Sequence, residues 1–132
     1  KFFVTSKRYN GFWKKMPTIS YKDNFKTALK IMNQKKLGIV VFLKNKFISG
    51  LVTDGDLRRE IKNYKKIKNL NKYMNKNPMV VNENMPASKA LAIMNEKKIT
   101  SLLVVSDKHF YKKNKTLKGI IHIHFLLQSG IK

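Results

Sequence analysis

The feature that most restricts the fold of this chain is an internal duplication with a period of about 60 residues. Residues 28–33 (ALKIMN) are matched by residues 90–95 (ALAIMN), and residues 50–53 (GLVT) are matched by residues 119–122 (GIIH). One copy is too short to bury both faces of a sheet. We therefore expect the two copies to pack together about a pseudo-twofold axis.

Each copy has the pattern strand–helix–strand–strand–helix. In the first copy we predict a strand at 18–20, a helix with apolar residues at i, i+3, i+4 and i+7, and strands at 39–43 and 47–52. The helix stripe is Phe25, Ala28, Leu29 and Met32. Either Asp23 or Asn24 is expected to cap that helix. A second helix is predicted at 56–62, and a longer polar hairpin at 106–116 in the second copy. The fold class is α/β, more specifically α+β.

The predicted domain organisation has four parts. An N-terminal arm or linker covers residues 1–15, and the first repeat covers 16–64. A connector at 65–76, in which Ile67, Leu70 and Met74 suggest a short amphipathic helix, leads to the second repeat at 77–132. Since the first residue is Lys1, we expect a longer parent protein.

The net charge of +22, from 29 basic and 7 acidic residues, raises the question of nucleic-acid binding. The basic residues are nearly all Lys and occur in every segment, whereas base readout and bidentate phosphate contacts favour Arg. Only Arg8, Arg58 and Arg59 occur. We therefore expect a solvated basic surface and no specific nucleic-acid partner.

Other classes of protein are disfavoured by what the chain lacks. It has no cysteine for disulfides or thiolate zinc sites, and no apolar run approaches the roughly 20 residues that a bilayer requires. The seven scattered acidic residues form no nucleophile–base pair with a neighbour. We expect a cytoplasmic, non-membrane protein that is not itself an enzyme and needs no cofactor.

The turn at residues 53–59 (TDGDLRR) is the best candidate site. Thr53 offers a hydroxyl, Asp56 a carboxylate, and Arg58 and Arg59 offer planar donors suited to phosphate. Together they could hold a pair of sugar hydroxyls and a phosphate. The alternative is structural: Asp56 caps the following helix and the arginines are solvated.

Several motifs resemble the paired cystathionine-β-synthase (CBS) domains that sense adenosine and nucleotides. These are residues 51–59 (LVTDGDLRR), Met74 with Asn77-Pro78, residues 98–105 (KITSLLVV) and residues 119–124 (GIIHIH). The last two favour the C-terminal module of the bacterial D-arabinose 5-phosphate isomerase (SIS-CBS sugar isomerase) family. That resemblance implies an N-terminal sugar-isomerase (SIS) domain converting ribulose 5-phosphate to arabinose 5-phosphate for Kdo and lipopolysaccharide synthesis. Some sugar-phosphate nucleotidyltransferases carry a similar turn and are an alternative.

The resemblance also implies where a ligand would bind. In CBS pairs a cleft combines the Thr-x-x-Asp turn of one repeat with the first strand and the start of the second strand of the other. Carried over, the ligand-binding residues are Thr53, Asp56, Arg59, Pro78, Met79, Val80, Thr100 and Ser101. An adenosine nucleotide or a CMP-sugar is the expected ligand. The alternative is that Thr100 and Ser101 only end a helix and satisfy backbone groups.

The second cleft departs from the family pattern because Phe125 stands where an Asp is usual. A phenyl ring cannot accept ribose hydroxyls, so we expect no ordinary nucleotide binding there and Phe125 packed in the core or on a neighbouring chain. The remaining candidates in this cleft are Thr18, Ile19, Gly38, His122 and His124. If the strand continues, the two histidines share a face, but no third ligand is near and no metal is expected.

Three hypotheses therefore stand. The first is a regulatory module that binds a nucleotide or nucleotide-sugar and acts on an attached isomerase domain. The second is a structural module that helps to form a homo-oligomer, with a vestigial cleft. The third is a nucleic-acid binder that uses the net charge.

Overall fold

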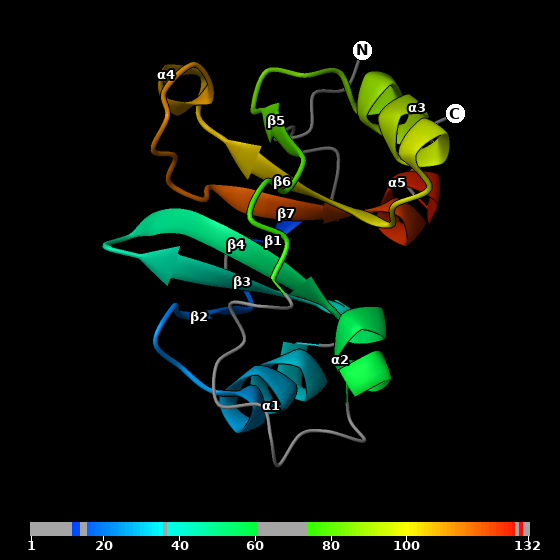
Figure 1. Ribbon diagram of the computed structural model, residues 1–132. Coiled ribbons are helices and arrows are strands. Elements are labelled where there is room, and N and C mark those ends of the chain that lie inside the picture. The colour runs from blue at the N-terminus through cyan, green and yellow to red at the C-terminus, as the bar shows by residue number, and fades with distance from the viewer. Residues whose placement is uncertain (1–11, 14–15, 36, 61–73, 129, 131–132) are drawn as a thin grey trace. The chain divides into compact units, whose positions relative to one another are not determined.

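A computed structural model describes residues 12–13, 16–35, 37–60, 74–128 and 130 (Figure 1). The chain divides into two compact units, Pro17–Pro78 and a second unit formed by Lys1–Met16 with Met79–Lys132. Both contain a small sheet with helices, which confirms the predicted α/β class. The predicted domain bounds and the pseudo-twofold packing stay predictions.

The unit Pro17–Pro78 is built on a sheet of strand order β2-β3-β4. Its elements are β2 (Thr18–Ser20), α1 (Phe25–Lys35), β3 (Ile39–Lys44), β4 (Phe47–Thr53) and α2 (Asp54–Glu60). Strand β2 runs parallel to β3, and β3 pairs antiparallel with β4. The β3–β4 turn has positive φ at Asn45 (50°) and Lys46 (66°), the backbone that a tight two-residue hairpin requires.

Helix α1 follows its predicted amphipathic pattern. Asn24 is its N-cap, because the Asn24 Oδ1 accepts the Thr27 N–H at 3.0 Å, whereas Asp23 accepts the Ser20 N–H. Three residues of the predicted stripe are buried and the fourth, Leu29, packs against the same core. The buried core cluster of this unit comprises Ile19, Phe25, Ala28, Met32, Val40, Phe42, Val52, Leu57 and Met74.

The edge of β4 is paired with the last residues of the predicted connector. Leu51 and Asn75 exchange both backbone hydrogen bonds, at 3.0 and 2.8 Å. The neighbouring Met74 side chain is buried against Gly50, where a Cβ atom would lie only 1.8 Å from the Met74 sulfur. Gly50 is therefore required by the close approach of a side chain. The predicted connector helix falls largely on residues 61–73, which lie outside the described part of the chain.

The second unit has the strand order β1-β7-β6-β5. Its elements are β1 (Phe12–Trp13), β5 (Val80–Asn82), α3 (Ala87–Lys97), β6 (Ser101–Val105), α4 (Asp107–Phe110), β7 (Gly119–His122) and α5 (Ile123–Gln128). Strands β5 and β6 are parallel, and β7 is antiparallel to both β6 and β1. The core cluster contains Val81, Ala87, Ala90, Leu91, Met94, Leu102, Val104, Ile121 and Leu126.

Two sequence predictions need correction. The helix predicted at 56–62 is α2, which begins at Asp54, because Thr53 and not Asp56 is the residue at its N-cap. The polar hairpin at 106–116 contains a helix, α4, whose N-cap Ser106 accepts the His109 N–H through its side chain. Capping residues determine where these helices begin, and the spacing of apolar residues does not indicate the position of a cap.

Candidate functional site

The turn between β4 and α2 is held by a reciprocal pair of hydrogen bonds. The Asp56 N–H donates to the Thr53 Oγ1 at 3.1 Å, and the Thr53 N–H donates to the Asp56 Oδ2 at 3.0 Å. This is a capping box, in which the first and fourth residues satisfy two backbone donors that the helix leaves unpaired. Both side chains are partly buried. The Asp56 carboxylate is thereby held in one orientation at the end of the sheet.

The structural alternative for Asp56 is thus partly correct: Asp56 does stabilise the helix start, as the fourth residue of the box. This role leaves its chemistry compatible with a ligand, because a carboxylate has two oxygens and about four acceptor positions. Arg58 does not join the turn in the expected way. Its guanidinium pairs with Asp54, one helical turn back, at 2.8 Å, and is 78% exposed. The Arg59 side chain lies outside the described residues.

In the same unit the structure brings together residues that the sequence assigned to two different clefts. Thr53 lies opposite Ile39 in the β3–β4 register, and the Asp54 N–H donates to the Gly38 carbonyl at 2.8 Å. Gly38 has φ +73°, which favours glycine there. Thr18 lies in β2 opposite Val41. Ile19 belongs to the core cluster, so its side chain is not available to line a site.

The second unit has the corresponding arrangement at the end of its own sheet. Ser101 lies opposite His122, and the Ile123 N–H donates to the Thr100 carbonyl at 2.8 Å. Thr100 is exposed, whereas the Ser101 Oγ is inaccessible and has no hydrogen-bond partner within the described part of the chain. The alternative in which the Ser101 hydroxyl satisfies backbone groups is therefore wrong for that residue.

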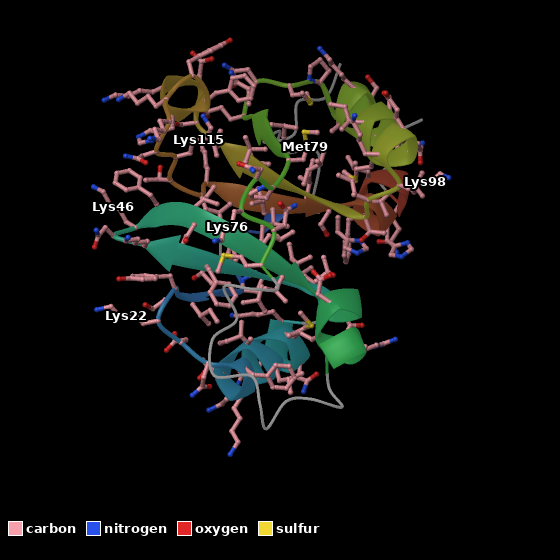
Figure 2. The ribbon with its side chains drawn as sticks, viewed as in Figure 1. Lys22, Lys46, Lys76, Met79, Lys98 and Lys115 are labelled. Carbon is pink, nitrogen blue, oxygen red and sulfur yellow. The ribbon has the colours of Figure 1, made fainter. Side chains whose placement is uncertain are left out.

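Residues 78–80 complete the predicted ligand set. Val80 opens β5 and is partly buried, as is Pro78 at the end of the other unit. Met79 is 41% exposed, which is high for a large apolar side chain (Figure 2). A flexible thioether at the surface is suited to contact an apolar ring.

His122 occupies the position in the second repeat that Thr53 occupies in the first, but it forms a different turn. The His124 N–H donates to the His122 Nδ1 at 3.2 Å, and the two imidazole rings stack with centroids 4.8 Å apart. The pKa of His122 is lowered from 6.5, first by burial and second by the nearby His124. The expectation that both histidines lie on one strand is wrong, since β7 ends at His122 and His124 is in α5.

Phe125, at the position of Asp56, packs against the core cluster of its unit, as expected. Its ring also meets the His122 ring edge-on, with centroids 6.3 Å apart. Among the residues that the structure describes, no group of three or more His, Asp or Glu side chains could hold a metal ion. Within the same residues, no helix is both long and apolar enough to cross a bilayer.

One polar cluster was missed from the sequence. Glu83 accepts the Asp107 N–H at 2.8 Å and forms an ion pair with Lys118, and both contacts lower the pKa of Glu83. The Asn82 amide donates to the Asp107 Oδ1 at 2.7 Å. Ser106 followed by Asp107 is a helix-start signal that could have indicated α4. Glu83 and Lys118 are 35 residues apart, so no local pattern reports their pairing.

The family comparison decides between the possible readings of this duplicated fold. The CBS domain model matches the chain twice, at residues 12–63 and 67–124. The chain belongs to the CBS domain family. Each match contains one strand–turn–helix site, the Thr53 turn in the first and the His122 turn in the second.

Proteins of similar sequence are longer than this chain. An uncharacterized protein, RP505, of Rickettsia prowazekii is 35% identical over 117 residues, which cover 88% of this chain and 34% of that protein. A probable arabinose 5-phosphate isomerase of Haemophilus influenzae is 34% identical over 99 residues, covering 72% of this chain and 29% of the isomerase. The chain therefore spans about a third of the length of these relatives.

Solved structures share the fold at lower identity. The CBS domain pair of protein MJ0100, in complex with 5′-methylthioadenosine and S-adenosyl-L-methionine, matches with a TM-score of 0.77 at 17% identity, covering 93% of this chain and 94% of that one. CBSX2 in complex with AMP matches with a TM-score of 0.76 at 18% identity, covering 92% of both chains.

Proposed function

We propose that this chain is a regulatory CBS pair that binds an adenosine nucleotide and is not itself catalytic. The observation that carries the proposal is the Thr53–Asp56 capping box, which holds a partly buried carboxylate in one orientation. Orienting an acceptor before a ligand arrives reduces the entropy lost on binding. A ribose diol, which offers two hydroxyl donors, is the chemical group that such a carboxylate suits.

The rest of the predicted ligand set supports the same ligand class. Thr100 offers an exposed hydroxyl. Met79 provides exposed apolar surface for a base. Two structural neighbours, MJ0100 and CBSX2, were solved with adenosine compounds bound. We favour AMP or a related adenosine compound over a CMP-sugar.

The proposed context is an isomerase of the arabinose 5-phosphate type. The Haemophilus relative carries that name, and the chain covers 29% of it, which leaves most of that relative for another domain. We infer that the attached domain performs the chemistry and that nucleotide binding to the CBS pair changes its activity. Such control requires the nucleotide to bind one conformation of the whole protein more tightly than another.

Calorimetric titration of AMP, ATP, S-adenosylmethionine and a CMP-sugar tests the binding. We expect an adenosine compound to bind, and Asp56→Asn to weaken it by about 10- to 100-fold, since hydrogen bonds to a charged group contribute roughly 1.5–3 kcal/mol. Asn keeps an oxygen that can accept the Thr53 N–H, so the turn should survive. Asp54→Asn, in the same helical turn, is the matched control and should bind normally. Heat from no compound, or equal affinity in both variants, would reject the proposal.

A structural role in a homo-oligomer is the second candidate. The observation in its favour is Leu127 on α5, an apolar side chain that is 54% exposed. Light scattering over a range of concentrations tests it, and Leu127→Ser should shift a multimer towards the monomer. A monomer at every concentration would remove this candidate.

A further inference from the structure

The connection between β6 and β7 is much longer than its counterpart in the first unit. The β3–β4 hairpin needs only the Asn45-Lys46 turn, whereas residues 106–118 contain helix α4 and a further turn. Long connections in compact domains commonly carry function. In Figure 1 this loop lies at the opposite end of its sheet from α3 and α5, and therefore from the His122 turn.

The loop is internally rigid because its backbone and side chains are cross-linked. The Lys115 ammonium donates to the carbonyl of Phe110 at 2.7 Å, and also to those of Lys112 and His109 (Figure 2). The His109 and Phe110 carbonyls belong to the last turn of α4, where the helix dipole also favours a cation. Lys115 is therefore a structural residue of the loop.

The base of the loop is fastened to the preceding strand. Asp107, at the start of α4, accepts from the Asn82 amide and donates its N–H to Glu83, and Glu83 pairs with Lys118 at the other end of the loop. Two of the loop's lysines therefore make contacts within the unit: Lys115 donates to backbone carbonyls, and Lys118 forms an ion pair with Glu83.

The tip of the loop combines an exposed aromatic ring with cations. Tyr111 is 80% exposed, and its ring is supported edge-on by Phe110, with centroids 5.0 Å apart. Lys108, Lys112 and Lys113 are exposed around it. Tyr is a residue type that dominates the centre of protein interfaces, because its large ring loses little side-chain entropy when it is buried.

We propose that this tip, defined as Lys108, Tyr111, Lys112 and Lys113, is a docking site for an acidic segment of a partner protein. Charge complementarity selects the partner: three lysines with no described acidic residue between positions 108 and 118 repel basic surfaces. A second copy of this chain, with a net charge of +22, is therefore a poor occupant.

A protein segment also fits better than the other anionic partners. Single-stranded nucleic acids bind to grooves in which several aromatic rings stack on successive bases, whereas one ring stands at this tip. Membrane attachment through three lysines at roughly 1 kcal/mol each would be weak without apolar residues that insert. A carboxylate-rich peptide can pair with the lysines and cover the phenol at the same time.

Amide chemical shifts of the isotope-labelled chain, titrated with poly-L-glutamate, test the proposal. We expect the largest shifts in residues 108–114, and a loss of affinity of at least about fivefold in Tyr111→Ala and in Lys112→Ala/Lys113→Ala. The matched control is Lys89→Ala/Lys97→Ala, which removes two exposed lysines of α3 and should bind like the parent. Lys115→Met keeps the tip residues but loosens the loop, so it should bind more weakly than the parent chain.

Oligothymidylate and phosphatidylserine vesicles are titrated in parallel. Tighter binding of either probe at the tip, shifts spread evenly over all lysines, or equal effects of the α3 control variant would overturn the proposal. The test is independent of nucleotide binding, because Asp56→Asn should leave poly-L-glutamate binding unchanged.

Discussion

His122 shows how one substitution changes a duplicated site. In the first unit the Thr53 hydroxyl accepts the N–H of Asp56, three residues on. In the second unit the His122 Nδ1 accepts the N–H of His124, two residues on. The Nδ1 of His122 can accept only while it carries no proton, so this turn depends on the protonation state of His122.

The resulting prediction concerns pH. The pKa of His122 is below 6.5 in the folded chain. As the pH falls below 6.5, the unfolded chain therefore binds more protons than the folded chain, and the free energy of unfolding decreases. Urea unfolding at neutral and mildly acidic pH should show this loss. In His122→Asn, whose amide oxygen can accept the same N–H without titrating, this part of the loss should disappear.

His124→Asn separates the two causes of that shift. Burial is the larger cause and the neighbouring charge the smaller, so His124→Asn should keep most of the pH dependence. If His124→Asn removes it and His122→Asn does not, the assignment to His122 is incorrect.

Thr53 gives a second prediction for a single residue. Thr53→Ala removes the acceptor for the Asp56 N–H and should lower the free energy of unfolding by about 1 kcal/mol, up to ~2. Thr53→Ser keeps the hydroxyl and should cost much less. Thermal and urea unfolding measure both changes, and equal stability of the Ala and Ser variants would show that the hydroxyl does not cap α2.

Among the elements, the contact between β4 and the last residues of the predicted connector is the most sensitive to mutation. Gly50→Ala places a Cβ 1.8 Å from the Met74 sulfur and 3.1 Å from the Asn75 carbonyl, so the buried Met74 must move. Overpacking of this kind typically costs roughly 1–3 kcal/mol. Urea unfolding should show such a loss.

Met74→Ala provides the check on this contact. It removes the clashing atoms, so the double variant should be more stable than the sum of the two single effects predicts. The neighbouring Ser49→Ala serves as control and should change stability little. Strict additivity would mean that Gly50 is needed for another reason.

Residue patterns predicted most of the elements but not how they end. The alternating and i, i+4 patterns of apolar residues located β2 and α1 because burial of one face dictates that spacing. Helix α4 was not predicted because it has no buried residue, and its sequence therefore shows no apolar periodicity. The start of α2 was misplaced because two acceptors, Thr53 and Asp56, competed for one cap.

For the whole molecule, the duplicated turns predict the number of ligands. Asp56 provides a carboxylate in one turn, and Phe125 packs on the core in the other. Calorimetry should therefore give one adenosine nucleotide per chain, and none of comparable affinity in Asp56→Asn. Two equal sites per chain would show that Phe125 does not exclude a ligand.

The net charge of +22 supports a separate prediction about nucleic acids. Any binding to a DNA fragment should be non-specific and should fall steeply with salt, vanishing in a mobility-shift assay near about 150 mM. Retention at that salt concentration, with a preference for one sequence, would restore the third hypothesis.

By itself the sequence determined the duplication, the α/β elements and the residue types of both turns, because these follow from local spacing and from side-chain chemistry. Tertiary structure alone decided which polar side chains pair across long stretches of the chain and which side chains enter a core. It joined Glu83 to Lys118 across the loop and placed Ile19 in a core. These outcomes depend on distances between segments far apart in the chain, which a pattern of neighbours does not contain.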